Sequence, residues 1–452
     1  MKRFFLPAIS LALLVSCSVK DPILSVEGGK VQGIPDESGK VVVFKGVPYA
    51  APPVGELRWK APAPVVPWEG IRLADTFSPI APQQGNPPGT FYGDEFYWEG
   101  TPAQSEDCLY LNVWAPASSI GKPRRKLPVA MWIHGGAYVN GYGHEVTMDG
   151  TEWARRGVIL VTINYRLGVL GFLTHPLLSD EQGGHSGNYG TMDQIAALRW
   201  IRDNIAQFGG DPDNITIFGQ SAGAMSVKTL CESPQSRGLI SGAIIQSGGG
   251  ISGVMQPLTY PEAYYEMVGK AVMDEGGFDT LEKMREASYE DLYAAQVSYM
   301  TSGKGRATFS PHVDGVVVTD DFGNAAIRGT IADIPYLIGY NKDDMGMLAG
   351  DSVHRFCAVR DSLGGAPVFE YEFLRNLPGD DDDPAKDPGA FHSAELWYTF
   401  GTLDRSWRPF TKQDHALSEE MLDAWTSFCR EGDPHWTSYT RSNPYRKEFD
   451  IR

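Results

Sequence analysis

Short apolar runs alternate with amphipathic segments along most of the chain, and this alternation predicts its architecture. Continuous apolar runs at residues 127–133, 158–165 and 242–246 are typical of parallel strands that are buried on both faces. Between them, residues 192–208 carry apolar side chains at helical spacing. Strands that alternate with helices predict an α/β fold, with a central, twisted, mostly parallel sheet and helices on both of its faces.

The N-terminal region shows strand patterning of another kind. Residues 31–44 predict two short strands around a turn at residues 36–39, which together form a small N-terminal antiparallel hairpin. A further strand is predicted at residues 109–114. Residues 91–98 hold five aromatic side chains and predict a loop. That loop either forms a hydrophobic rim over an active site or is only pinned by its own aromatic rings.

The C-terminal half continues the alternation of strands and helices. We expect two or three helices in residues 260–296, a helix at residues 322–328, an apolar strand at 334–339, a last strand at 368–374 and a C-terminal helix at 419–430. No internal repeat and no long linker interrupts the pattern. Residues 17–452 are therefore predicted to form one catalytic domain.

Residues 1–16 are predicted to be a signal peptide that is removed from the mature protein. A positive pair at Lys2 and Arg3 precedes an apolar stretch that is too short to span a bilayer. The letters LVSC at residues 14–17 resemble a bacterial lipobox, which implies cleavage before Cys17 and lipidation of its sulfur. Ser18 after this cysteine resembles an outer-membrane address. The alternative is an ordinary signal peptide and a secreted protein, in which Cys17 is incidental.

The composition fits a globular protein and excludes several classes of partner. The chain has 452 residues, of which 42% are hydrophobic, and a formal net charge of −17. This charge argues against nucleic acid and against an anionic membrane surface as partners. Four cysteines besides Cys17 are too few for a disulfide framework. Neither C-x-x-C nor H-E-x-x-H occurs, so we expect no metal and no cofactor.

One pentapeptide carries the chemistry of the chain. Residues 214–218 predict a short buried strand, residues 219–223 read GQSAG, and a helix is predicted from Ala222. A strand, a tight turn and a helix in this order are typical of a nucleophile elbow, which would place Ser221 at its apex. Gly219 and Gly223 are needed there because side chains would collide with the neighbouring strand and helix.

A serine nucleophile needs a base, and the base needs an acid that orients it. In α/β hydrolases the acid follows the serine in the chain, just after a strand. Asp344 meets this condition best, because it follows the apolar strand at residues 334–339. Asp343 is the alternative acid. Asp314 is expected to cap a turn instead.

Four histidines follow these acids, and we predict His392 as the base. His392 comes after the last predicted strand, through a loop rich in glycine and proline. His354 lies only ten positions after Asp344 and would need a very tight loop. His415 lies near the start of the C-terminal helical segment, and His435 lies in a turn near the tail.

Acyl transfer also needs N–H donors for the oxyanion that forms on the reacting carbonyl. The backbone N–H of Ala222 is one candidate. The others should come from the loop at residues 135–137, which follows the strand at residues 127–133.

Several motifs together resemble the type-B carboxylesterase and cholinesterase family of α/β hydrolases. They read GVPYAA at residues 46–51, EDCLYLN at 106–112, WIHGG at 132–136, NYRLG at 164–168 and GNYG at 187–190, in addition to GQSAG. The resemblance implies the α/β-hydrolase fold, a triad of Ser221, Asp344 and His392, and an oxyanion hole of Gly136, Ala137 and Ala222. It also implies structural ion pairs between Arg58 and Glu106 and between Arg166 and Asp193.

The chain departs from the family pattern at four points. Ala137 replaces a glycine of the oxyanion loop, and Asp344 replaces the usual glutamate of the triad. Ala81 stands where the family has the disulfide partner of Cys108, so Cys108 is expected to be a free thiol. Only 48 positions separate Asp344 from His392 (392 − 344). Because relatives carry a longer helical region there, we expect a more open site.

These observations predict a serine carboxylic-ester hydrolase that acts through an acyl-enzyme on a small or aromatic ester. Two alternatives stay open. The first is a catalytically silent binding protein like the neuroligins, which resemble the fold but have lost the nucleophile. The second is an amidase or peptidase that uses the same triad. The expected partner is a small-molecule ester, with contact to a membrane only through the lipid on Cys17, and the oligomeric state stays undetermined.

Overall fold

The computed structural model describes residues 22–251, 260–307, 309–344, 348–379 and 389–451. The predictions for the signal peptide and for Cys17 lie outside these residues. Among the described residues, no helix combines the length and the apolar character needed to cross a bilayer.

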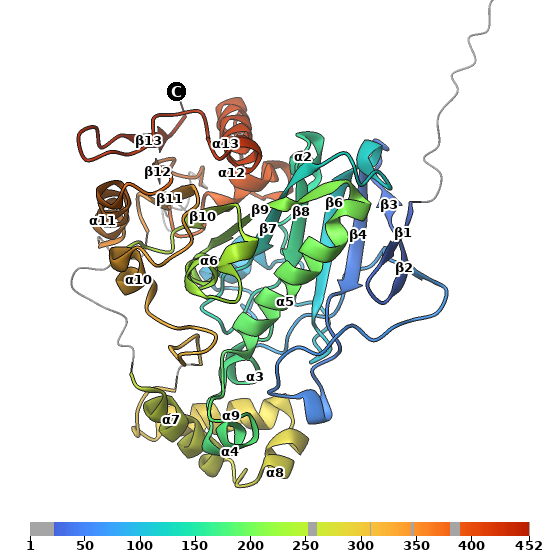
Figure 1. Cartoon of the computed structure of the whole chain (residues 1–452), viewed down its shortest axis with the longest axis vertical. Coiled ribbons are helices and arrows are strands. Elements are labelled where there is room, and N and C mark those ends of the chain that lie inside the picture. Colours follow the sequence, from blue (N-terminus) through green and yellow to red (C-terminus); the bar gives the residue numbers. More distant parts are fainter. Residues whose placement is uncertain (1–21, 252–259, 308, 345–347, 380–388, 452) are drawn as a thin grey trace, which may run out of the picture.

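One large sheet organises the chain, and its order is β13-β12-β11-β10-β9-β7-β8-β6-β4-β3 (Figure 1). All neighbours from β13 to β8 pair in parallel, whereas β6, β4 and β3 are antiparallel. This arrangement confirms the predicted mostly parallel sheet. The strands are β3 (Ile34–Pro35), β4 (Val41–Pro48), β6 (Tyr110–Pro116), β7 (Leu127–Ile133), β8 (Ile159–Ile163), β9 (Gly210–Gln220), β10 (Gly242–Gln246), β11 (Tyr336–Asn341), β12 (Val368–Phe373) and β13 (Arg446–Phe449).

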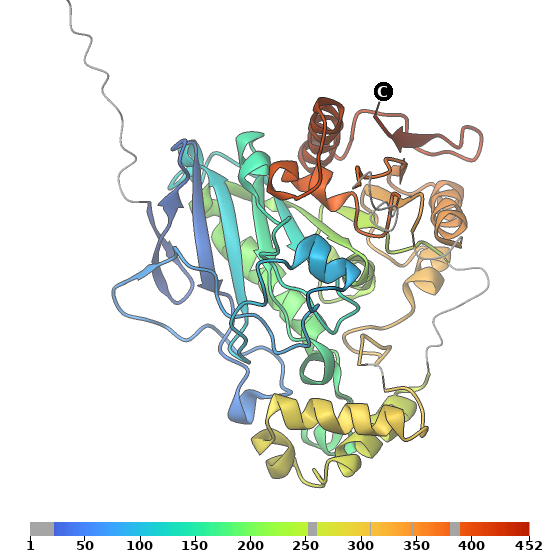
Figure 2. The ribbon, with the colours of Figure 1, turned by 180° about the vertical axis from the view of Figure 1, so that it is seen from behind.

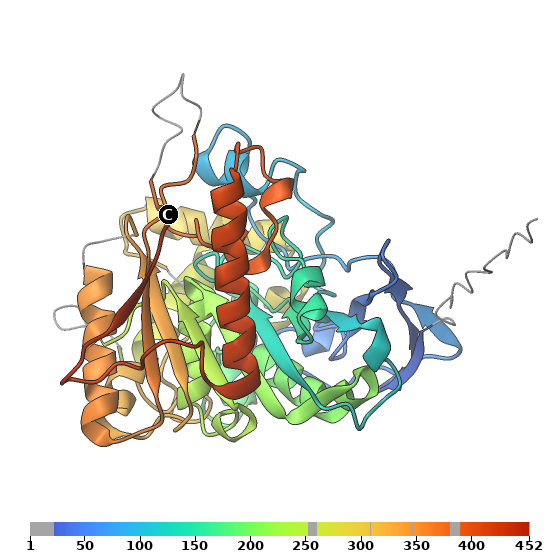
Figure 3. The ribbon, with the colours of Figure 1, turned by 90° about the horizontal axis from the view of Figure 1, so that it is seen from above.

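Helices cover both faces of this sheet, as the alternation of strands and helices predicts. Side chains of a strand point to opposite faces in turn. In β7, Met131 and Ile133 accordingly pack into the core under α5 (Tyr189–Asn204) and α6 (Ala222–Glu232), while Trp132 packs into the core on the other face. That second core is covered by α2 (Thr151–Arg155), α12 (Leu396–Phe400) and α13 (Lys412–Glu431), the long red helix in Figure 3.

A helical group lies at one end of the molecule, in yellow in Figure 2. It contains α7 (Glu262–Glu275), α8 (Leu281–Glu286) and α9 (Tyr289–Thr301), which agrees with the two or three helices predicted there. The remaining short helices are α3 (Gly168–Phe172), α4 (Pro176–Glu181) and α10 (Phe322–Arg328), and a 3-10 turn at Ile205–Phe208 follows α5.

The predicted N-terminal hairpin forms between β3 and β4, around a turn in which Asp36 accepts the N–H of Val41 at 3.0 Å. A second hairpin, of β1 (Ile23–Val26) and β2 (Gly29–Gln32), joins β5 (Ile71–Leu73) in a separate three-stranded sheet.

Three predictions about elements are wrong. Residues 91–98 are not a loop: α1 (Phe91–Phe96) forms there, and Thr90 caps it by accepting the N–H of Gly93 at 3.2 Å. The last strand is β13 rather than β12, and it pairs in parallel at the edge of the sheet. The C-terminal helix begins at Lys412, seven residues earlier than predicted (419 − 412), because a capping box formed by Thr411 and Asp414 starts it. The helix α11 (Leu348–Leu363) was not predicted.

Candidate active site

Ser221 lies in a strained turn between β9 and α6. Its φ of 56° and ψ of −124° are unusual for a residue with a side chain. The turn is close to its neighbours, because a Cβ at Gly223 would lie 2.0 Å from the carbonyl oxygen of Ile133. A Cβ at Gly219 would lie 2.5 Å from the carbonyl carbon of Gly223. The two glycines therefore permit the turn that presents the Ser221 hydroxyl.

The structure brings His392 and Asp344 into direct contact. Nδ1 of His392 forms a short hydrogen bond with Oδ1 of Asp344, whose side chain is only 4% exposed. The other carboxylate oxygen of Asp344 accepts the N–H of Asn341 at 3.3 Å, which fixes the carboxylate. Because the Asp344 carboxylate can only accept, the ring proton is assigned to Nδ1 of His392. Nε2 is then left as a proton acceptor. Nε2 lies 3.2 Å from Nε2 of Gln220, an amide that donates.

Asp343, the alternative acid, points elsewhere. Its carboxylate accepts the N–H of Ala390 at 2.9 Å, and its backbone N–H donates to the carbonyl of Ala390 at 3.1 Å. The Asp343 side chain is 41% exposed. Asp343 thus holds the segment that leads to His392 and does not contact the ring.

The other three histidines lie on the surface with partners of their own. His354 pairs with Glu370, His415 with Asp404 and His435 with Glu431. None of them lines the pocket that contains Ser221.

The aromatic helix α1 supports the His392 segment, next to α12 (Figure 2). The Tyr92 hydroxyl donates to the carbonyl oxygen of His392 at 3.0 Å. The Phe91 ring packs edge-on against the Phe391 ring, with the two ring centroids 4.9 Å apart. Tyr92, Phe96 and Tyr97 also line the pocket that contains Ser221. The aromatic rings of residues 91–98 therefore pack on one another and also form part of the lining of this pocket.

A second buried carboxylate lies close to this pair and was missed in the sequence. Glu395 is fully buried and accepts hydrogen bonds from Asn341 at 2.5 Å and from Gln246 at 3.3 Å. Burial raises the pKa of Glu395, and the charge of Asp344 raises it further. Burial lowers the pKa of His392, but its hydrogen bond with Asp344 and the charges of Asp344 and Glu395 outweigh this effect, and the pKa is raised.

The predicted oxyanion loop, residues 135–137, follows β7 and lines the pocket that contains Ser221. The φ angles of Gly136, Ala137 and Tyr138 are 98°, 54° and 63°, all in the left-handed region. A Cβ at Gly136 would lie 2.1 Å from the carbonyl oxygen of Asn140, so a glycine is required there. Ala137 adopts this strained conformation with its methyl group exposed. Ala222 provides the first N–H of α6.

Ser221, His392 and residues 135–137 line one pocket of about 220 Å³. It is lined by Asn86, Tyr92, Phe96, Tyr97, Gly135, Gly136, Ala137, Asn140, Glu145, Met148, Gln220, Ser221, His392, Ser393 and Leu396. The serine, the histidine and the oxyanion loop therefore share one cavity. The arrangement can place an ester carbonyl against the serine, with a buried imidazole and backbone N–H groups beside it.

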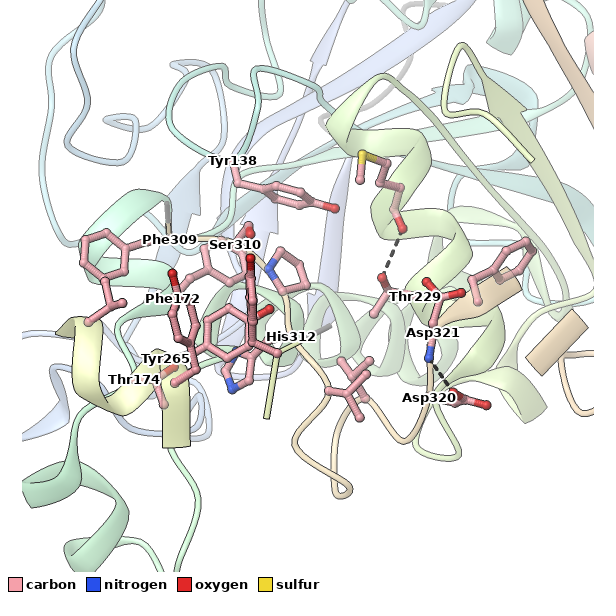
Figure 4. A pocket seen from close by; sticks show the side chains of 18 of the residues that line it. Tyr138, Phe172, Thr174, Thr229, Tyr265, Phe309, Ser310, His312, Asp320 and Asp321 are labelled. Carbon is pink, nitrogen blue, oxygen red and sulfur yellow. Dashed lines mark hydrogen bonds between the residues drawn. The ribbon is translucent and has the colours of Figure 1, made fainter. Parts of the chain in front are cut away.

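A larger cavity of about 530 Å³ is lined by Tyr138 and by residues of several helices and loops, and the sequence did not indicate it (Figure 4). Tyr138, the residue after Ala137, forms one edge of this cavity, and Met225, one turn of α6 beyond Ser221, forms another. Aromatic side chains such as Phe172, Tyr265 and Phe309 line it. Neither Ser221 nor His392 reaches it.

The structural pairs implied by the resemblance are present. Arg58 pairs with Glu106, and Arg166 pairs with Asp193 at 2.7 Å in a buried site. Cys108 is a buried free thiol, as expected from Ala81. Within the described ranges, no group of three or more His, Cys, Asp and Glu side chains could hold a metal ion.

The parallel sheet, the elbow after β9, and the acid and histidine after later strands define an α/β hydrolase. The chain belongs to the carboxylesterase family, whose model matches residues 20–361 and 350–450. A para-nitrobenzyl esterase of Bacillus subtilis is 35% identical, with 92% of each chain covered. A solved para-nitrobenzyl esterase structure superimposes with a TM-score of 0.82 at 31% identity, covering 95% of this chain and 96% of that one.

Other relatives widen the range of known roles. A fumonisin B1 esterase of Sphingopyxis macrogoltabida is 37% identical, over 82% of this chain and 64% of its own length. Mouse neuroligin-2 is 32% identical, over 94% of this chain and 63% of its own length. The family and the neighbouring esterases show that the protein is a carboxylic ester hydrolase.

Proposed function

We propose that Ser221, His392 and Asp344 form the catalytic triad of this hydrolase and that it works through an acyl-enzyme. Nε2 of His392 takes the hydroxyl proton as the Ser221 oxygen attacks the ester carbonyl. The negative charge on the carbonyl oxygen is stabilised by the N–H groups of Gly136, Ala137 and Ala222. His392 then gives the proton to the leaving alcohol, and the acyl group stays on Ser221.

The second half of the reaction returns the enzyme to its starting state. A water molecule gives a proton to His392 and attacks the acyl carbon, and the same N–H groups stabilise the second oxyanion. When this intermediate collapses, the proton returns to the Ser221 oxygen and the carboxylic acid leaves.

The contact between His392 and Asp344, in the wall of the pocket that holds Ser221, carries this proposal. It supports catalysis over a silent, neuroligin-like role, because a binding protein has no need of a buried imidazole, with Nε2 as a proton acceptor, in the same pocket as a strained serine. The same geometry would serve an amidase, so the leaving group must be identified by assay.

For the substrate we propose a small or aromatic ester. The pocket is only about 220 Å³ in volume, and Tyr92, Phe96 and Tyr97 form an aromatic wall. The relative of this protein in Bacillus subtilis is named a para-nitrobenzyl esterase. The motif at residues 14–17 supports the further proposal of an exported enzyme that is anchored by a lipid on Cys17.

Rapid mixing with p-nitrophenyl acetate tests the acyl-enzyme. We expect a burst of about one p-nitrophenol per chain before the steady state, because p-nitrophenol is a good leaving group, so acylation is faster than deacylation and acetate accumulates on Ser221. Amide analogues such as p-nitroacetanilide serve as the comparison. Turnover of the amide at a rate similar to that of the ester would favour the amidase instead.

The pH dependence of kcat/KM tests the assigned base. Only the neutral imidazole can accept the Ser221 proton, so activity should fall as the pH drops through the pKa of His392. Asp344 and Glu395 raise that pKa, so the fall should be centred above about pH 6.5, the ordinary histidine value. The Asp344→Asn variant should move the remaining activity toward lower pH. A flat wild-type profile down to about pH 4 would exclude His392 as the base.

A further inference from the structure

Glu145 is a buried acid in the same pocket as Ser221 and His392, and the triad does not use it. Its side chain lines the pocket, although the residue is only 8% exposed. The Tyr97 hydroxyl donates to its Oε1 at 2.9 Å, and the backbone N–H of Tyr142 donates to the same oxygen at 3.1 Å. Both internal bonds therefore converge on one carboxylate oxygen. Among the described residues, no hydrogen bond engages Oε2.

The surroundings of Glu145 leave its charge without a counterion. Among the described residues, no lysine or arginine forms an ion pair with Glu145, and none lines the pocket. Burial raises the pKa of Glu145 to about 7, against the opposing effect of its hydrogen bonds with Tyr97 and Tyr142. Oε2 is not among the buried polar atoms that lack a partner, so this oxygen is accessible and can accept a hydrogen bond from a donor in the pocket.

The pocket also indicates which part of an ester would meet Glu145. His392 must give its proton to the leaving alcohol oxygen, so the alcohol lies on the His392 side of the reacting carbon. The pocket of about 220 Å³ contains both His392 and Glu145. Asn86, Asn140 and Tyr97 add further polar groups to the same cavity. Neither His392 nor Glu145 lines the larger cavity next to Tyr138.

We propose that Glu145 is a specificity-determining residue, which accepts through Oε2 a hydrogen bond from an N–H or O–H donor on the alcohol part of the ester. This inference rests on the proposed function of Ser221 and His392. Hydroxylated and ammonium-bearing alcohols share the required donor, and the experiment separates them. The competing explanation is a purely structural role, in which Glu145 only ties Tyr97 at the end of α1 to the segment after the oxyanion loop.

Acetate esters of matched length distinguish the two roles. Butyl acetate has no donor, 3-hydroxypropyl acetate has a hydroxyl group in place of the last methyl group, and 3-(dimethylamino)propyl acetate has an ammonium group. All three pass through the same acetyl-enzyme, so a preference for the alcohol must appear in kcat/KM rather than in the rate of deacylation. We expect wild-type enzyme to prefer at least one donor ester over butyl acetate by about tenfold or more.

Three variants locate the origin of this preference. Glu145→Met should remove it for every donor ester, and Glu145→Gln should remove it for the ammonium ester because the charge is lost. Tyr97→Phe breaks the same internal hydrogen bond but leaves the carboxylate, so it should keep the preference. For each variant the preference is measured as the ratio of kcat/KM for a donor ester to kcat/KM for butyl acetate, so that a general change in activity cancels from the comparison.

Each outcome decides between the roles. A preference for the ammonium ester alone, the hydroxyl ester alone or both, lost in Glu145→Met, supports the proposal and identifies the donor. No preference in the wild type, or a preference that survives in both Glu145 variants, overturns it. Absence of wild-type activity on every ester would instead contradict the proposed function of Ser221.

Discussion

The Ser221→Ala variant is expected to lose about 10⁴-fold or more of the wild-type kcat on p-nitrophenyl acetate. The variant keeps the oxyanion loop and the His392–Asp344 pair, but it has no oxygen that can form the acyl-enzyme. Steady-state hydrolysis, measured with an enzyme preparation free of wild-type contamination, gives the result. The loss should appear in kcat, because alanine leaves the pocket lining otherwise unchanged.

Ser226, on the helix α6 that follows Ser221, offers a matched control. Its hydroxyl is buried and accepts a hydrogen bond from Gln194 at 3.0 Å, but it does not line the pocket. Ser226→Ala should therefore lower stability by about 1 kcal/mol and change kcat by less than about threefold. Substantial activity in Ser221→Ala, with Ser226→Ala equally active, would exclude Ser221 as the nucleophile.

The adjacent acids should differ sharply when each is replaced by asparagine. Asp344→Asn is expected to lower kcat about 10³- to 10⁴-fold near neutral pH. The asparagine amide would donate to Nδ1 of His392, which forces the ring proton onto Nε2 and blocks proton transfer from Ser221. Asp343→Asn keeps an oxygen that can accept the N–H of Ala390, so its kcat should stay within about threefold of wild type.

This pair controls for charge and for position, since each variant removes one negative charge at neighbouring residues. Steady-state kinetics of both variants, with a thermal unfolding curve for each, separates a catalytic from a structural effect. A large loss in Asp343→Asn with an active Asp344→Asn would reverse the assignment of the acid.

Structural features that depend on neighbouring residues in the chain were the ones that the sequence predicted best. A buried strand followed by GQSAG and a helix is a local signal, and Gly219 and Gly223 show the close approach that it requires. The adjacent acids were harder to separate, because both follow β11 at the same edge of the sheet. Only the fold shows that Asp344 turns inward to His392 while Asp343 turns to Ala390.

Elements held by distant partners could not be predicted in the same way. The helix α1 contains the buried Glu95, which forms an ion pair with Arg408 at 2.8 Å and accepts a hydrogen bond from the Trp397 indole at 2.9 Å. Both partners lie about three hundred positions later in the chain. Without those partners, the segment has the composition of an aromatic loop. The short strand β13 reads RKEF, with three charged residues out of four, and its place at the edge of the sheet depends on its pairing with β12.

The two buried acids near the proposed triad, Glu395 and Glu145, were missed for a related reason. Glu395 follows His392 by three residues in an irregular segment, and Glu145 lies outside the motifs. Their importance depends on burial and on convergence with groups from other elements, which spacing in the sequence does not show. The shorter connection between Asp344 and His392 still predicts a more open site than in relatives.

Labelling with a fluorophosphonate, followed by peptide mass mapping, tests the central claim most directly. Such reagents phosphonylate a serine that is activated by a neighbouring base. We predict one adduct per active chain, on the peptide that contains Ser221, with hydrolytic activity lost in proportion to labelling. No label should appear on Ser221→Ala, and labelling of Asp344→Asn should be greatly slowed. An adduct on another residue, or full activity after complete labelling of Ser221, would contradict the assignment of Ser221 as the nucleophile.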